Sequence, residues 1–263
     1  MKDVQNQPDH RNIPIDKVGV KNIRYPITVL DRVNQTQQTV ASINMYVNLP
    51  HHYKGTHMSR FIEVLSQYSN NINLRKVPDI LEAIKTRLDA ESAHIEVQFP
   101  YFIEKSAPVS GAKSLMEYNV AFRGSLNGGG LDLVVEVAVP VTTLCPCSQQ
   151  ISEAGAHNQR GLVRVAVRFK RFLWIEDLIH LVEQSASSEV YSLLKREDEK
   201  FVTEQAYATP MFVEDVVREV SLKLEADDNI TWFAVDSENF ESIHNHSAYA
   251  YIERDKRQPA RGE

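Results

Sequence analysis

The chain has 263 residues, of which 43% are hydrophobic and 24% are charged, and its formal net charge is −6 at pH 7. These proportions are ordinary for a soluble globular protein, and the length allows one large or two small domains with a real core. The negative charge argues against general nucleic-acid binding, although an anionic small molecule would need only a local basic pocket. No run of about 18 apolar residues occurs, so no membrane span is expected.

The N-terminus and the two cysteines favour a cytoplasmic protein. Residues 1–7 lack the apolar core of a secretory signal. Cys145 and Cys147 are separated only by Pro146, a spacing that does not indicate a structural disulfide framework. We therefore expect a reducing compartment, with both thiols free for chemistry or for metal binding.

The first half of the chain predicts a unit over residues 19–127, preceded by a polar N-terminal arm at 1–18. Alternating apolar residues indicate strands, and apolar residues at helical spacing indicate helices. In chain order, the expected elements are strands over 19–30 and 38–47, helices around 58–65 and 77–88, and strands around 95–99 and 118–122.

The second half predicts a similar unit over residues 131–254, followed by a flexible tail at 255–263. Its expected elements are strands over 131–141 and 162–169, helices around 174–182 and 212–224, and strands around 230–235 and 247–252, with a weaker helical pattern at 189–200. The order ββααββ thus occurs twice, which predicts an α+β fold with two antiparallel sheets, each covered by helices on one face. Open sheet edges need partners, so we expect a homo-oligomer in which the sheets join into closed barrels.

The connection over residues 142–161 is long for a compact domain and is the candidate active-site loop. Its two cysteines are either small packing residues or thiolates that act as metal ligand or nucleophile, one facing the site and the other secondary. Their spacing is tighter than that of zinc knuckles. His157 lies between Gly155 and Gly161 without an apolar face, so it is a ligand, a proton shuttle or a surface residue.

A second candidate cluster lies between the last two predicted strands, in Glu241-Ser242-Ile243-His244-Asn245-His246. Glu241 and His244 can point to one centre in a turn, whereas His244 and His246 would share a face in an extended segment. Surface histidines are common, but a glutamate and two histidines in six residues favour metal binding. Thiolate, imidazole and carboxylate donors together suit zinc, and they leave manganese or ferrous iron open.

Other charged residues have two interpretations each. Glu214 lies beside the apolar stripe of its helix, as a solvated acid near the helix start or as a buried acceptor for two N–H groups of a guanine or pterin. Glu199 belongs to a charge run that is solvated by default. Lys54, His57 and Arg60 surround a helix start, where they either contact phosphate or form a surface cap.

Several motifs, spread over nearly the whole chain, resemble the prokaryotic GTP cyclohydrolase type IB family. They are Asp3-Val4-Gln5-Asn6, Val18-Gly19-Val20-Lys21, Thr56-His57-Met58-Ser59-Arg60-Phe61, Cys145-Pro146-Cys147-Ser148, His157-Asn158-Gln159-Arg160-Gly161 and Glu241-Ser242-Ile243-His244. The resemblance implies a tunnelling fold with two tandem ββααββ units, assembled as a homotetramer with active sites between subunits. It also implies that GTP and water are converted to formate and 7,8-dihydroneopterin triphosphate, the first step of tetrahydrofolate biosynthesis.

The resemblance also assigns site residues. It implies one divalent metal per site, zinc, manganese or Fe(II), held by Cys145, His157, Glu241 and His244 with Glu199 as a further ligand. It implies that Glu214 anchors the purine. A metal can supply hydroxide for hydration of guanine C8, His157 or His246 can move protons, and no redox cofactor is needed. Cations must hold the triphosphate, and Arg160, Arg60 and Lys54, with the neighbouring His57, are the candidates.

Three other functions remain open at this point. A related GTP cyclohydrolase of the same fold forms a cyclic phosphate product, and a related nitrile reductase uses a cysteine and NADPH without a metal. The pair Glu241 and His244 argues against the reductase. A zinc-stabilised interaction module without turnover is the third, and it would unfold on chelation.

Overall fold

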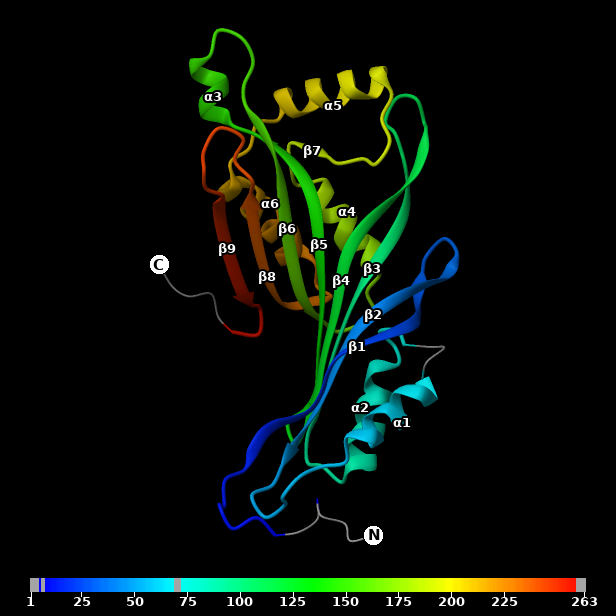
Figure 1. Cartoon of the computed structure of the whole chain (residues 1–263). Coiled ribbons are helices and arrows are strands. Elements are labelled where there is room, and N and C mark those ends of the chain that lie inside the picture. Colours follow the sequence, from blue (N-terminus) through cyan, green and yellow to red (C-terminus); the bar gives the residue numbers. More distant parts are fainter. Residues whose placement is uncertain (1–4, 6–7, 69–71, 259–263) are drawn as a thin grey trace. The chain divides into compact units, whose positions relative to one another are not determined.

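The computed structural model of the chain describes residue 5 and residues 8–68 and 72–258 (Figure 1). Most of the motif Asp3-Val4-Gln5-Asn6 and the end of the predicted tail, residues 259–263, lie outside these described residues. The chain forms two compact units. Unit 1 comprises residues 1–100 and 121–135, and unit 2 comprises residues 101–120 and 136–263. In the described ranges, no helix combines the length and the apolar character needed to cross a membrane.

Three long strands contribute to both units: β3 (Ala93–Ser106), β4 (Lys113–Asn127) and β5 (Gly130–Leu144). The compact units therefore divide the chain differently from the predicted tandem units at 19–127 and 131–254. Sequence periodicity shows where a strand runs, but it does not show that the two ends of one strand pack into different cores.

Unit 1 begins with β1 (Ile15–Asp31) and β2 (Gln35–Leu49), a long antiparallel hairpin whose register runs from Ile15 opposite Leu49 to Asp31 opposite Gln35. β1 thus starts inside the predicted arm. Alternate residues of β2 are buried, among them Ile43 and Met45, which are both 0% exposed. This period of two is the pattern of a sheet with one face on a core.

Helices α1 (Met58–Tyr68) and α2 (Val77–Leu88) lie side by side against the strands of unit 1 (Figure 1). Both are amphipathic, and α2 buries Ile80, Leu81 and Ile84. Gly124 of β4 lets α2 sit close to the sheet, since a Cβ there would meet Val77 Cγ1 at 2.8 Å.

Unit 2 contains most of the remaining elements: α3 (Pro146–Ile151), β6 (Asn158–Phe169), α4 (Ile175–Glu183), β7 (Ser188–Glu189), α5 (Arg196–Ala208), α6 (Val213–Ala226), β8 (Ile230–Asn239) and β9 (Ala248–Asp255). Its sheet has the order β5-β6-β8-β9, and the short β7 pairs with β5. β6 with β8, and β8 with β9, are antiparallel neighbours. α6 packs on β8 and β9, and α4 packs beside α6 (Figure 1).

The α+β class with antiparallel strands is confirmed, and two short elements, α3 and β7, go beyond the predicted element order. α3 and β7 are too short for a periodic pattern, and α5 begins only at Arg196, late in the weakly helical stretch. β5 extends to Leu144 and β6 begins at Asn158. The candidate loop is consequently residues 145–157, shorter than the predicted 142–161.

A buried acid fixes the start of α5. Asp198 is 0% exposed and accepts hydrogen bonds from the N–H groups of Val109, Ser110 and Lys195 at 2.8–2.9 Å, and from Ser110 Oγ at 2.6 Å. Burial alone would raise the pKa of Asp198, but these four hydrogen bonds outweigh it and hold the pKa well below its ordinary value.

A second cluster of polar side chains connects β3 and β4 to α4 through hydrogen bonds and ion pairs. Lys105 Nζ lies 2.6 Å from Glu183 Oε1 and 2.7 Å from Glu189 Oε2, and the Tyr118 hydroxyl donates to Glu183 Oε1 at 2.6 Å. Burial, reinforced by the charge of Glu183, raises the pKa of Tyr118 far above its ordinary value. Tyr118 is therefore a permanent donor to Glu183 rather than a titrating group.

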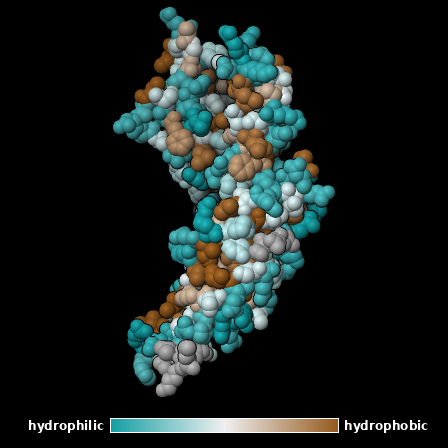
Figure 2. Space-filling model, turned by 45° about the vertical axis from the view of Figure 1, so that its right-hand side comes forward, coloured by the Kyte–Doolittle hydropathy of each residue, from teal (hydrophilic) through white to brown (hydrophobic). Residues whose placement is uncertain are grey.

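Hydrophobic side chains also reach the surface, where Figure 2 shows them among hydrophilic ones. In unit 2 they include Tyr249 and Tyr251, which are 61% and 53% exposed on β9. β9 ends the strand order of the described sheet, so its outer edge is available for pairing.

Candidate active site

Cys145 stands at the end of β5, where it caps the short helix α3. Its Sγ accepts a hydrogen bond from Ser148 N at 3.4 Å. Pro146 follows at the first helical position, where its missing N–H costs nothing. Cys145 is partly buried and Cys147 is exposed. The cap holds the sulfur of Cys145 in one place, and the structure thereby separates two cysteines that their spacing alone left equivalent.

His157 closes the same loop and is tied to Cys145 through the backbone. Cys145 N donates to His157 O at 3.1 Å, and His157 N donates to Ser148 Oγ at 3.2 Å. The ring is held as well, because Gln159 Oε1 lies 3.0 Å from Nδ1 and Gln159 Nε2 donates to Thr143 Oγ1 at 2.9 Å. The cysteine and the histidine are therefore both fixed in place at the junction of β5 and β6.

Glu241 reaches His157 from the loop that joins β8 to β9. Its Oε2 lies 3.9 Å from His157 Nδ1, and both side chains are 13% exposed. Gly161 allows this close approach of β6 and β8, since a Cβ there would stand 2.7 Å from Asn239 Oδ1. Asn239 is 2% exposed, and its Oδ1 has no hydrogen-bond partner among the described residues.

The remaining predicted ligands are not gathered around this pair. His244 and His246 are exposed, and their rings stack on each other with centroids 5.2 Å apart. Glu199 is exposed in the first turn of α5. Within residues 5, 8–68 and 72–258 the chain forms no group of three His, Cys, Asp or Glu side chains placed for a metal. The single chain links Cys145 to His157 through the backbone and places Glu241 near the His157 ring, whereas His244 and Glu199 are exposed.

The chemistry of these three donors fits a divalent metal. A thiolate sulfur, an imidazole nitrogen and a carboxylate oxygen come from three short segments that the fold brings together, and zinc accepts all three atom types. The carboxylate also suits harder ions such as manganese. These residues would hold the metal, together with the further ligands that the sequence resemblance implies.

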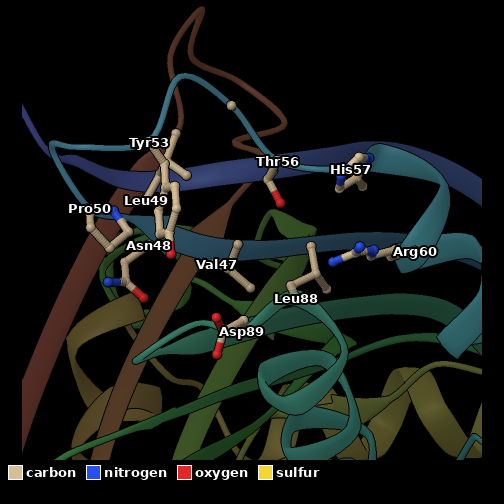
Figure 3. Close-up of a pocket in the computed structure, with 11 residues that line it drawn as sticks. Val47, Asn48, Leu49, Pro50, Tyr53, Thr56, His57, Arg60, Leu88 and Asp89 are labelled. Carbon is tan, nitrogen blue, oxygen red and sulfur yellow. The ribbon is translucent and has the colours of Figure 1, made fainter. Parts of the chain in front are cut away.

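A separate cavity of about 140 Å³ lies in unit 1 (Figure 3). Residues from the end of β2, the start of α1 and the end of α2 line it, and they include Thr56, His57, Arg60 and Asp89. Arg60 is partly buried and donates one N–H from Nη1 to Arg87 O at 3.3 Å. A guanidinium has five N–H groups in a planar fork, which suits the oxygens of phosphate. Two of the predicted triphosphate residues, His57 and Arg60, therefore share a cavity.

The other predicted substrate contacts lie on the surface of the chain. Lys54 and Arg160 are exposed, and Glu214 is exposed in the first turn of α6. Thr143, Ser148, Gln159 and Ser242 around the cysteine and histidine, and Asp89 in the cavity, were not identified from the sequence. The motifs contain Ser148, Gln159 and Ser242, but their contacts depend on strand pairing that periodicity does not show.

Solved structures of low sequence identity share the fold. The chain is similar to a uricase from Bacillus fastidious with a TM-score of 0.55 and 6% identity, covering 92% of this chain and 93% of the uricase. It is also similar to the uricase from Arthrobacter globiformis, with a TM-score of 0.52 and 8% identity over 94% and 96% of the two chains. These likenesses establish the tunnelling fold and nothing about the reaction.

Sequence comparison identifies relatives of much higher sequence identity. The chain is 63% identical over 257 residues to GTP cyclohydrolase FolE2 of Syntrophobacter fumaroxidans, covering 97% of this chain and all of the relative. It is 64% identical over 255 residues to GTP cyclohydrolase FolE2 of Syntrophus aciditrophicus, with the same coverage. The family model described as Type I GTP cyclohydrolase folE2 matches residues 1–250. The chain therefore belongs to the type I GTP cyclohydrolase family of the FolE2 kind.

Proposed function

We propose that the chain is a metal-dependent GTP cyclohydrolase that converts GTP and water to formate and 7,8-dihydroneopterin triphosphate, the first step of tetrahydrofolate biosynthesis. Its relatives of about 60% identity are named GTP cyclohydrolases, and they align over nearly the full chain. The observation that supports this most directly is the convergence of Cys145, His157 and Glu241 from the ends of different strands.

The reaction must hydrate C8 of guanine, open the imidazole ring, release formate and close a new ring with ribose carbons. A bound divalent metal supplies hydroxide near neutral pH and a positive charge for the developing oxyanion. Cys145, His157, Glu241 and His244 would hold that metal, with Glu199 as a further ligand. The loop-bound histidines are the groups suited to proton transfer, and His157 or His246 would accept and return protons at the opening ring.

Substrate orientation requires one acceptor for the purine and several donors for the phosphates. Glu214 would accept two N–H bonds from guanine, and its exposure in one chain leaves it available to a site completed by another subunit. Arg60 and His57 stand at the N-terminus of α1, which has no acidic residue in its first turn. Backbone N–H groups and the helix dipole there also favour an anion. Lys54 and Arg160 would complete the triphosphate contacts.

The proposed enzyme is a cytoplasmic homotetramer with active sites between subunits. Strands β1 and β9 are the two end strands of the described sheet, and pairing of such edges closes a barrel and removes the aggregation hazard. His244, His246 and Glu199, which one chain leaves on its surface, could then approach the Cys145 site of the same or a neighbouring subunit.

The direct test incubates purified, metal-reconstituted protein with GTP and measures formate together with pterin fluorescence after oxidation. We expect both products in equal amounts, and absence of both would overturn the enzyme assignment. Product mass separates dihydroneopterin triphosphate from a cyclic phosphate. Turnover without NADPH argues against a nitrile reductase, and chelation that stops turnover without unfolding the chain argues against a zinc-stabilised module.

A further inference from the structure

We propose that Gln159 is a positioning residue that keeps the imidazole proton of His157 on Nδ1 and thereby directs the Nε2 lone pair at the metal. The assignment of the proton depends only on the geometry of this chain. The role toward the metal rests on the proposed function, and the experiments below separate the two.

In the structure, the Gln159 amide directs its NH₂ group at the buried Thr143 and its oxygen at His157. Gln159 is 7% exposed and Thr143 is 0% exposed, so neither can exchange its hydrogen bond for one with bulk water at little cost. Gln159 Nε2 donates to Thr143 Oγ1 at 2.9 Å. This leaves Oε1 of the same amide facing His157 Nδ1 at 3.0 Å. An amide oxygen only accepts, so the hydrogen in this contact belongs to Nδ1.

The other polar groups near Nδ1 agree with a proton at that position. Ser242 Oγ lies 3.5 Å from Nδ1, and Glu241 Oε2 lies 3.9 Å from it. The carboxylate can only accept when ionised, and the hydroxyl can accept. A neutral imidazole with its proton on Nδ1 has its only lone pair on Nε2, which is a metal-binding nitrogen.

Histidines that bind metals commonly donate their second ring N–H to a carboxylate, carbonyl or water, which fixes tautomer and ring orientation. The Gln159 amide oxygen occupies this position at His157. Since the His157 backbone is also bonded to Cys145 and Ser148, the ring is fixed relative to the Cys145 sulfur. Thr143 on β5 and Gln159 on β6 thus form a buried relay that pre-organises one ligand before metal arrives.

The competing arrangement is a reversed amide. Gln159 Oε1 would then accept from the Thr143 hydroxyl, Nε2 would donate to Nδ1, and the ring proton would lie on Nε2. In that case Nδ1 would be held by the amide and Nε2 could not bind a metal without first losing its proton. The two arrangements therefore predict opposite tautomers for the same residue.

The first experiment measures the His157 tautomer in metal-free protein by long-range proton–nitrogen correlation of ¹⁵N-histidine. The His157 signal is assigned by its loss in His157→Asn. We expect the proton on Nδ1 in wild type and in Gln159→Glu, whose carboxylate still accepts. We expect Gln159→Met, which cannot accept in this way, to lose that preference. A proton on Nε2 in wild type would overturn the proposal.

The second experiment measures Co²⁺ affinity from thiolate-to-cobalt absorbance. Removing a group that hydrogen-bonds to a metal ligand typically weakens metal binding by about 10- to 100-fold, so we expect a change of that size for Gln159→Met and little change for Gln159→Glu. Gln184→Met is the matched control, because the exposed Gln184 contacts His180 at 2.7 Å at the C-terminal end of α4, outside the proposed site. Circular dichroism confirms that each variant is folded.

Substitutions of Thr143 provide a second pair of variants, which leave the Gln159 amide itself unchanged. Thr143→Val removes the hydroxyl while keeping the shape, and we expect it to shift the tautomer and weaken Co²⁺ binding. Thr143→Ser keeps the hydroxyl and should restore both. Unchanged affinity in Gln159→Met and Thr143→Val would overturn the positioning role. If wild type bound no Co²⁺, the proposed role of Gln159 toward the metal would fail together with the proposed function. The measured tautomer would still decide whether Gln159 keeps the His157 proton on Nδ1.

Discussion

At the scale of single residues, the N-cap of α3 distinguishes the two cysteines of the loop over residues 145–157. The sequence presents Cys145 and Cys147 as a symmetrical pair around Pro146. The structure makes Cys145 the acceptor for Ser148 N and leaves Cys147 exposed. A local sequence pattern could not distinguish them, because the difference arises where β5 ends and where His157 returns to the loop.

The two thiols should therefore respond differently to substitution. Cys145→Ala removes a proposed metal ligand, and we expect formate release from GTP to fall by more than the roughly 100-fold that loss of an outer partner causes. Cys147→Ala should retain most of the activity. The same preparations, assayed for bound metal, should show loss only for Cys145→Ala. The reverse pattern would mean that the thiols are assigned the wrong way round.

Arg60 permits a prediction that concerns binding rather than chemistry. Its guanidinium lines the unit 1 cavity, and a hydrogen bond to a charged group contributes about 1.5–3 kcal/mol. Arg60→Ala should consequently raise KM for GTP by roughly 10- to 100-fold, at about 1.4 kcal/mol per factor of ten. Arg60→Lys should lie between, since an ammonium lacks the planar fork.

The control for this cavity is Lys76→Ala, which removes an exposed cation paired with Asp79 at the start of α2. It should leave KM unchanged. If Arg60→Ala lowered kcat and left KM alone, the cavity would not be the triphosphate site.

At the scale of elements, the periodic ones were predictable and the short ones were not. Alternating burial in β2 and the apolar stripe of α2 follow directly from the sequence. α3 and β7 depend instead on a cysteine cap and on two residues pairing with β5. The early start of β1 could not be predicted either, because its first residues are exposed and carry no apolar alternation.

Gly19 marks a close approach within the β1–β2 hairpin. A Cβ at this position would stand 2.0 Å from Met45 O, a backbone atom that cannot rotate away. Gly19→Ala should destabilise the fold by about 3 kcal/mol, the upper part of the range for overpacking. Gly128→Ala is the matched control, since nothing lies within 4 Å of its Cβ position. Urea unfolding at one fixed protein concentration measures both, and equal midpoints would contradict the close approach.

Asp198 makes the attachment of α5 dependent on pH. Its pKa is lower in the folded chain than the ordinary value of 3.8, so the stability it contributes is present above that pH and is lost as pH falls. In Asp198→Asn one oxygen becomes an NH₂ group, which cannot accept from Lys195 N. The difference in unfolding free energy between wild type and Asp198→Asn should therefore be largest near neutral pH and shrink below pH 3.8.

Denaturant titrations across that pH range measure the difference directly. Asp79→Asn, which affects only an exposed ion pair with Lys76, should track wild type closely. A constant gap between wild type and Asp198→Asn at every pH would show that the carboxylate charge does not stabilise this junction.

At the scale of the whole molecule, the sequence motifs predicted the family and the fold, but not which parts of the site one chain would bring together. Cys145, His157 and Glu241 lie in neighbouring segments, because β6 and β8 pair in antiparallel fashion and the start of β6 lies beside the end of β8. Glu214, Glu199 and His244 remain exposed, and no pattern within one chain states what another copy will place against them. Residues whose partners belong to another subunit are the least predictable from sequence.

Subunit mixing tests this composition of the site. We expect wild type to have a mass near 120 kDa, four times the 30.0-kDa chain. Cys145→Ala and Glu214→Gln should each be inactive alone. If the metal and the purine anchor come from different subunits, random mixing of the two variants restores about a quarter of the wild-type sites, because each site takes one intact residue from each parent. If both residues of a site belong to one chain, mixed tetramers contain no intact site and activity stays at the level of the single variants. Native mass spectrometry that detects tetramers containing both variants controls for subunit exchange.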